Sequence, residues 1–197
     1  MKCNFKRLLS GLLVLMILSS FMVIGVSADV LDLNRKCSLN LELKVPDDKG
    51  ELQPVNGTVG LYQVALTQYQ GADEILVPTA SFVGADLNLR NLTDEESLLS
   101  KAPVEDLEKY IKDRHLNPKF KADTDEEGRA RFRNLPAGLY LVTRVTPKGA
   151  PATYTMNSFL VSLPRMNQKG MYDYACRTPM QVRRCPGGSG QGRYHCL

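Results

Sequence analysis

Residues 122–145 constrain the fold of this 197-residue chain more than any other segment. An acidic turn at 125–128 leads into the short run 129–133, and a second turn, Leu135-Pro136-Ala137-Gly138, leads into the apolar run 139–145. Turn residues that bound runs rich in β-forming residues are typical of antiparallel strands. The segment therefore predicts three successive strands of one antiparallel sheet.

Alternation of apolar and polar residues predicts strands on both sides of this segment. Residues 37–45 alternate with a period of two, as a half-buried strand does, and residues 58–66 form a second apolar run. Further strands are expected at 119–122, 152–156, 158–163 and 171–177. About eight short strands separated by turns indicate a mainly β, antiparallel β-sandwich.

The region between the early and late strands is the least periodic part of the chain. Surface loops are expected from residue 67 to 101. A capping-box pattern, Thr93 with Glu96, predicts a short helix at 93–99, and apolar residues at helical spacing predict a better one at 103–116. The sandwich should therefore carry a short helical insertion around 93–116.

The first 28 residues have the pattern of a secretory signal peptide. A basic start is followed by an apolar core over residues 8–26 and a small-residue site ending at Ala28. We expect cleavage between Ala28 and Asp29, a secreted mature chain and no contact with the membrane afterwards. A transmembrane anchor is the alternative, because the apolar run is about long enough to span a bilayer.

The positive net charge does not indicate a nucleic-acid partner. The chain carries 25 basic and 21 acidic residues, but three of the basic residues precede Ala28 and four follow Cys176, where no acid occurs. The part expected to fold is thus slightly acidic. A basic face for nucleic acid is not supported.

Four cysteines remain once the signal peptide is removed: Cys37, Cys176, Cys185 and Cys196. They permit three pairings, and the sequence does not choose among them. A loop closed by Cys185 and Cys196 and free thiols are both open. The spacing matches no zinc pattern, so no metal and no cofactor are expected.

The last 17 residues differ in composition from the rest. Residues 181–197 are rich in Gly and Arg, contain no acid and show no apolar periodicity. Such a segment buries too little to order itself. We expect one folded domain over 29–180 and a disordered tail over 181–197; a truncated or shifted reading frame is the alternative origin of this tail.

The order of motifs resembles a known family. The pattern G-x-A-x-F-x-x-L-x-x-G-x-Y-x-V runs from Gly128 to Val142, preceded by VGLYQVA at 59–65 and followed by SFLVSLP at 158–164. This order resembles the prealbumin-like (Cna B-type) domains of Gram-positive surface proteins, and in particular the N-terminal domain of pilin subunits. The resemblance covers roughly residues 28–179. It implies an immunoglobulin-like sandwich on a structural or adhesive protein of the cell surface or fimbrium, without catalysis.

The family can form an isopeptide bond between a first-strand Lys and a late Asn, assisted by a buried acid. Lys44 occupies about the position of that Lys. Thr143 and Arg144 stand where the family keeps its acid, and no Asn follows the last strand. A cation cannot act as the acid that this chemistry requires. We therefore expect no isopeptide bond and a solvated Lys44.

The family also polymerises through a Lys in the motif W-x-x-x-V-x-V-Y-P-K. Aligned on Pro179, this motif places Met171 at the Trp, Ala175 and Arg177 at the two Val positions and Met180 at the Lys. Only the proline is retained, and the chain has no LPxTG sorting signal. The protein is thus expected to be unable, by itself, to form the sortase-made pilus bond.

An acidic turn offers a candidate calcium site. Asp123, Asp125, Glu127 and Gly128 match the first half of an EF-hand loop. The twelfth position is Asn134 instead of Glu, and strands are expected on both sides. A solvated hairpin turn is the favoured interpretation.

No set of residues indicates an enzyme. The only histidines, His115 and His195, lie near no nucleophile motif. Tyr62 and Tyr140 lie in apolar strands and are expected in the core. The expected partners are other pilin subunits or host surface ligands, and the alternative function is a soluble extracellular module that binds host glycan or matrix protein.

Overall fold

The computed structural model describes residues 29–47, 49–85, 87, 89, 101–145 and 154–184. The predicted signal peptide up to Ala28, the capping box at 93–96, and His195, Cys185 and Cys196 lie outside these residues. Within the described ranges, no helix is both long and apolar enough to cross a membrane.

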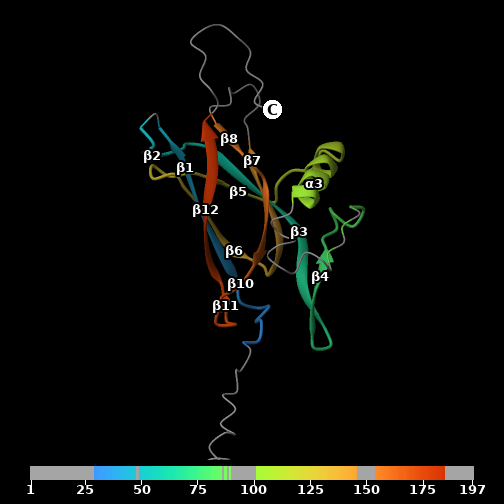
Figure 1. Cartoon of the computed structure of the whole chain (residues 1–197). Helices are drawn as coiled ribbons and strands as arrows, with labels where there is room; N and C mark the ends of the chain where they lie inside the picture. Colours follow the sequence, from blue (N-terminus) through green and yellow to red (C-terminus); the bar gives the residue numbers. More distant parts are fainter. Residues whose placement is uncertain are drawn as a thin grey trace, which may run out of the picture.

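In the described residues, two β-sheets face each other and one helix lies beside them (Figure 1). The first sheet has the order β2-β1-β12-β8, and β6 also pairs with β1. The second has the order β4-β3-β7-β9, and β5 also pairs with β3. A separate ribbon contains β10 and β11. The elements are β1 Cys37–Pro46, β2 Leu52–Pro54, β3 Thr58–Gln70, β4 Asp73–Pro78, α3 Lys101–Asp113, β5 Phe120–Asp123, β6 Arg129–Leu135, β7 Gly138–Val145, β8 Tyr154–Met156, β9 Phe159–Leu163, β10 Arg165–Met166, β11 Tyr172–Asp173 and β12 Ala175–Arg184.

The main core lies between the sheets and follows from the period-two alternation. Along β1, Leu39, Leu41 and Leu43 are fully buried, while the residues between them face outward. They pack with residues of the second sheet that include Leu61 and Tyr140. The predicted mainly β sandwich is confirmed.

The predicted arrangement of residues 122–145 as one antiparallel sheet is wrong. Strand β6 pairs with β1 in the first sheet, whereas β5 and β7 both pair with β3 in the second. The chain therefore crosses between the sheets at both turns. Local turn residues determine that a chain reverses, but not which sheet receives the next strand, because that depends on distant partners.

The second crossing is fixed by a tyrosine and a glycine. The hydroxyl of the fully buried Tyr140 donates to the carbonyl of Pro136 at 2.7 Å, the bonding pattern of a tyrosine corner. At Gly138 a Cβ atom would lie 2.2 Å from the carbonyl oxygen of Ala65. Only glycine permits β7 to begin this close to β3.

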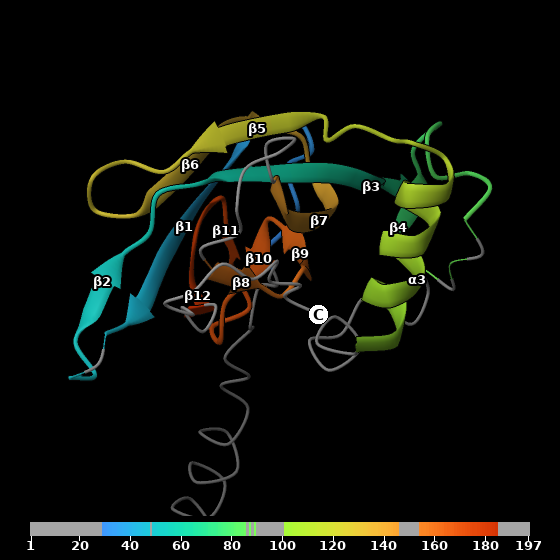
Figure 2. The same cartoon turned by 90° about the horizontal axis from the view of Figure 1, so that it is seen from above.

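Helix α3 covers the outer face of the second sheet (Figure 2). Leu107 is fully buried there against residues that include Val64 and Leu141. The helix lies within the predicted insertion. It ends at Asp113. Beyond it, His115 has a left-handed φ of 53°, and the N–H of Leu116 bonds to the carbonyl of Ile111 at 3.0 Å, which is a Schellman-type end.

Three strand features differ from the sequence-based expectation. Strand β3 continues to Gln70 and forms a hairpin with β4 through a turn at Gly71, where loops were expected. Strand β12 pairs in parallel with β1 in an otherwise antiparallel sandwich. It also runs through Arg184, so it includes four residues that we had placed in the tail beyond residue 180.

Candidate functional site on the first and last strands

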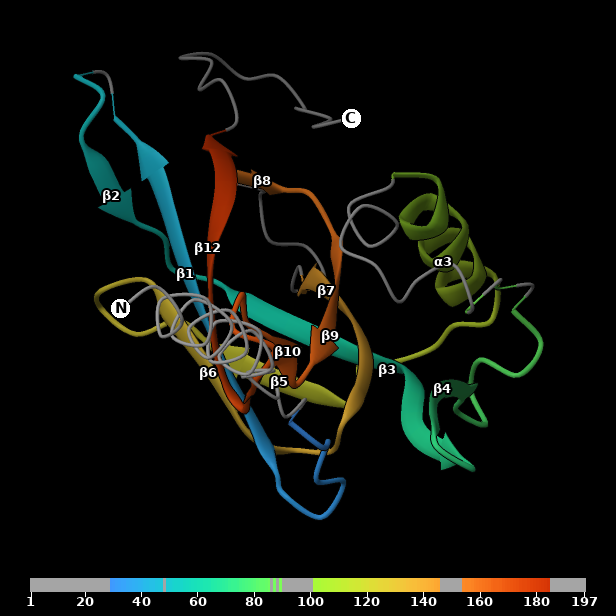
Figure 3. The same cartoon turned by 60° about the horizontal axis from the view of Figure 1, so that its bottom comes forward.

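The parallel pairing of β1 with β12 brings the predicted site residues together. The register runs from Ser38 opposite Ala175 to Lys44 opposite Gln181, and the two strands lie side by side in Figures 1 and 3. The isopeptide candidate Lys44 and the strand that carries the degenerate pilin motif are therefore neighbours.

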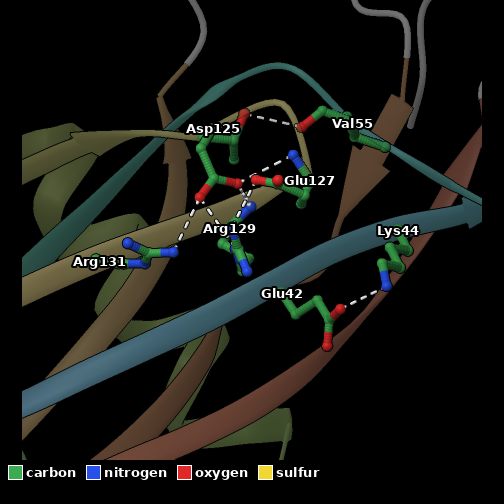
Figure 4. Close-up of polar contacts among 8 residues, drawn as sticks. Glu42, Lys44, Val55, Asp125, Glu127, Arg129 and Arg131 are labelled. Atoms are coloured by element: carbon green, nitrogen blue, oxygen red, sulfur yellow. Dashed lines mark hydrogen bonds and ion pairs between the residues drawn. The ribbon is translucent and has the colours of Figure 1, made fainter.

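Lys44 lies on the outer face of this pair. Its ammonium group is 2.5 Å from the carboxylate of Glu42, two residues earlier on the same face (Figure 4). The two side chains are 34% and 47% exposed. The Lys44 amine therefore lies outside the apolar core in which the isopeptide chemistry takes place.

Within the described ranges, no carboxylate is buried in the core. Among the described residues, Gln63 is the one buried polar side chain. Thr143 and Arg144, at the positions of the family acid, pair with Gly60 and Val59 of β3 and are half-buried. The part of the sandwich that the structure describes thus holds no buried acid that could protonate an amide.

The degenerate motif positions divide between the two faces of β12. Ala175, Arg177 and Pro179 are exposed on the outer face, whereas Met180 is 8% exposed and packs in the core. Met171, which precedes β11, is 47% exposed. The position that aligns with the polymerising Lys therefore points into the sandwich.

The acidic turn is closed by arginines and backbone amides. The carboxylate of Asp125 accepts from the Arg129 backbone at 2.8 Å and from its guanidinium at 3.0 Å (Figure 4), and Arg131 lies 3.3 Å away. Desolvation alone would raise the pKa of Asp125, but these bonds hold it below its ordinary value. Arg129 also pairs with Glu127. These interactions stabilise a structural turn. The turn joins β5 to β6, which lie in different sheets, so it is not the predicted hairpin turn.

No cluster of three or more potential metal ligands occurs in the described ranges. Within the same ranges, Asp123 accepts a bond from the Thr58 hydroxyl, and Asn134 lies in β6 with a φ of 59°. The residues of the EF-hand-like pattern thus each have a local structural role.

Two buried cysteines are a feature that the sequence alone did not single out. Cys37 and Cys176 are 1% and 4% exposed and both belong to the main core. Burial, and then the nearby Cys176, raise the pKa of Cys37 to about 11, and burial also raises the pKa of Cys176. Their proximity depends on the β1–β12 pairing, which no local pattern encodes.

A groove of about 440 Å³ opens beside the second sheet. Its walls include residues 159–166 and 74–76, so both edge strands of that sheet, β9 and β4, contribute. Tyr172 lies in the same groove, and its hydroxyl donates to Glu74 at 2.6 Å.

Tyrosines also attach the segment before β1 to this end of the molecule. The Tyr69 hydroxyl donates to the carbonyl of Leu31 at 2.9 Å, and the N–H of Asp32 donates to the Tyr174 hydroxyl at 2.8 Å. Asp29, the first residue after the predicted cleavage site, accepts a bond from the Tyr172 backbone at 3.1 Å.

The fold and the paired first and last strands define a β-sandwich module with a helical insertion. No protein-family model matches the chain, and no curated protein matches it. The solved structures that it resembles include Gram-positive pilin subunits.

Three of these structures show the extent of the likeness. The full-length major pilin SpaD from Corynebacterium diphtheriae is 22% identical, with a TM-score of 0.46, over 79% of this chain and 32% of that one. The T6 backbone pilin of serotype M6 Streptococcus pyogenes is 16% identical, with a TM-score of 0.45, over 77% and 29%. The major pilin SpaA from C. diphtheriae is 21% identical, with a TM-score of 0.41, over 75% and 30%. The present chain spans about a third of the length of these pilins.

Proposed function

We propose that this chain is an exported structural module of a Gram-positive cell surface, of the pilin type, that carries out no catalysis and does not itself form the sortase-made pilus bond. The observation that carries the proposal is the arrangement of the β1–β12 pair. Met180 occupies the core at the aligned Lys position, and Lys44 is solvated and paired with Glu42. The order of family motifs along a sandwich of the expected class supports the pilin type.

Expression in a Gram-positive host with a pilus sortase tests this function. We expect the mature chain in the surface or culture fraction, beginning at Asp29, and running as a monomer after boiling in detergent. The host's own motif-bearing pilin, which should form ladders, is the positive control. Ladders that contain this chain would disprove its inability to polymerise, and retention in the cytoplasm with residues 1–28 intact would disprove export.

Intact mass of the purified chain tests the absence of an isopeptide bond. Such a bond releases ammonia, a loss of about 17 Da. We expect the full mass of the mature sequence, with Lys44 reactive toward an amine-labelling reagent. A mass lower by one ammonia, with Lys44 protected, would contradict this part of the proposal.

A binding module for host glycan or matrix protein is the second candidate, and the groove beside β9 favours it. Its volume of about 440 Å³ lies within the range of ligand pockets. Screening the mature chain on glycan and matrix-protein arrays distinguishes the candidates. Saturable binding that Ser162→Trp in the groove abolishes, while the outer-face control Lys44→Gln leaves it intact, would favour the module; no binding leaves the structural role.

A further inference from the structure

Two of the four cysteines of the mature chain are placed on neighbouring strands and on the same side of the sheet. Cys37 begins β1 and Cys176 is the second residue of β12. Both side chains are buried in the core between the sheets. In the parallel register Cys176 lies opposite Leu39, so the two cysteines are offset by two positions along the strands.

Strand β12 separates these cysteines from Cys185. The strand is continuous from Ala175 to Arg184, and at about 3.3 Å per residue its stretch from Cys176 to Arg184 spans about 26 Å. Cys185 is bonded directly to Arg184, and consecutive Cα atoms lie about 3.8 Å apart. Since disulfide-linked Cα atoms lie less than about 7 Å apart, Cys185 can pair neither with Cys176 nor with Cys37 beside it.

This separation removes two of the three pairings that four cysteines allow, because each of those two joins Cys185 to one of the strand cysteines. We propose that Cys37 and Cys176 form a disulfide bond that links the first and last strands of the sandwich. The bond leaves Cys185 and Cys196 to each other or as free thiols. It forms while the chain folds in the oxidising environment to which the predicted signal peptide directs it.

The bond requires the backbone at Cys37 to move. In this structure both cysteines are free thiols. A spacing of about 4.8 Å between strands and about 3.3 Å per residue along them places Cα atoms offset by two positions about 8 Å apart, against about 4.4–6.8 Å in disulfides. Cys37 is the first residue of β1, and the ladder between β1 and β6 is irregular between Cys37 and Leu39. Closing the bond moves Cys37 by at least about 1 Å, which loosens its pairing with Leu135 at this irregular end of the ladder, whereas Cys176 is held within its strand.

The reaction is a thiol–disulfide exchange. The thiolate of one cysteine attacks an external disulfide, of a small molecule or an exported oxidoreductase, and releases one thiol. The thiolate of the second cysteine then attacks the mixed disulfide, forms the Cys37–Cys176 bond and releases the other thiol. Two protons and two electrons leave the protein and reduce the external disulfide.

The exchange must precede burial of the thiols. In the folded chain both side chains are out of reach of a disulfide reagent, and their raised pKa values keep the reactive thiolate scarce. The oxidised and reduced chains therefore do not interconvert once folded. The redox condition during folding decides which form is present.

Tryptic mapping of the full mature chain tests the pairing, because each cysteine lies in a separate peptide: 37–44, 170–177, 185–193 and 194–197. The chain is refolded with oxidised and reduced glutathione, alkylated in denaturant and digested without reduction. We expect peptides 37–44 and 170–177 joined, at their summed mass less two hydrogens. Alkylated Cys37 and Cys176, or a link from either to peptide 185–193, would overturn the proposal.

Matched variants provide a second readout. Cys37→Ser, Cys176→Ser and the double variant should lower the melting temperature of the oxidised protein to the same extent, and a reductant present during folding should abolish their difference from the parent. Cys185→Ser is the control and should leave the 37–176 link intact. Additive effects that persist under reductant would show that the two thiols only pack, and would refute the bond.

Discussion

The hydroxyl of Tyr140 should contribute strongly to stability, and Tyr140→Phe removes it without removing the ring. The hydroxyl donates to the Pro136 carbonyl at 2.7 Å and accepts from the Gln63 amide at 3.2 Å. The oxygen of that amide accepts in turn from Lys119 at 2.5 Å. Phenylalanine would therefore leave a carbonyl and an amide N–H without these partners.

The size of the loss follows from burial. Tyr140 is 0% and Gln63 3% exposed, and a buried polar group left unsatisfied costs about 1–3 kcal/mol. With two such groups we expect a loss of about 2–4 kcal/mol in the free energy of unfolding. For a domain of this size the melting temperature should fall by roughly 5–10 °C.

Urea unfolding of the parent and the variant, followed by circular dichroism, measures this loss. Tyr62→Phe is the matched control, since its half-buried hydroxyl donates to the Leu116 carbonyl at 3.3 Å, where water can replace it. We expect that control to cost less than about 1 kcal/mol.

A double-mutant cycle isolates the bond to Gln63. If the two side chains interact, Tyr140→Phe combined with Gln63→Leu should cost about 1 kcal/mol less than the sum of the single losses. The reasoning is refuted if Tyr140→Phe stays within about 0.5 kcal/mol of the parent, or if Tyr62→Phe costs as much.

Three further outcomes follow. Gly128→Ala should lower the free energy of unfolding more than Gly50→Ala. Both glycines have positive φ, but only at Gly128 would a Cβ meet backbone, 2.4 Å from the Leu43 carbonyl oxygen. Equal losses in urea unfolding would mean that the close approach is unimportant. Leu107→Ala should cost about 2–5 kcal/mol by leaving a cavity under α3, and a loss below about 1 kcal/mol would show that the helix packs loosely. In the reduced protein, the free energy of unfolding should fall by no more than about 3 kcal/mol between pH 9 and 11. The pKa of Cys37 is raised from 9.0 to about 11, so only the unfolded state loses this proton in that window. An unchanged alkaline profile in Cys37→Ser would contradict this origin.

The strands with regular alternation could be predicted from the sequence. β1 was recognised because Leu39, Leu41 and Leu43 face one sheet and the residues between them face solvent. β4 was missed because it is an edge strand whose apolar residues, Ile75, Leu76 and Val77, are consecutive and only half-buried and so show no alternation. The full length of β12 was not predicted, because its residues 181–184 belong to a stretch without acid or apolar periodicity.

The candidate site could be predicted in its residues but not in its arrangement. Sequence reasoning identified Arg144 and Met180 as positions that depart from the family's chemistry, and it expected Lys44 to be solvated. It could not place Met180 in the core or Cys37 near Cys176, because both depend on a pairing between strands that are more than a hundred residues apart. The prediction that residues 122–145 form one sheet was wrong for the same reason, because sheet membership also depends on distant strands.

The parallel alignment of the first and last strands has a mechanical consequence. The chain enters β1 at the end where β12 begins and leaves β12 at the opposite end. In the reduced chain, tension applied before Cys37 and beyond Arg184 would slide the two strands past each other. Their seven paired positions would then be loaded together in shear instead of being opened one at a time, a geometry suited to a domain that is pulled by both of its ends.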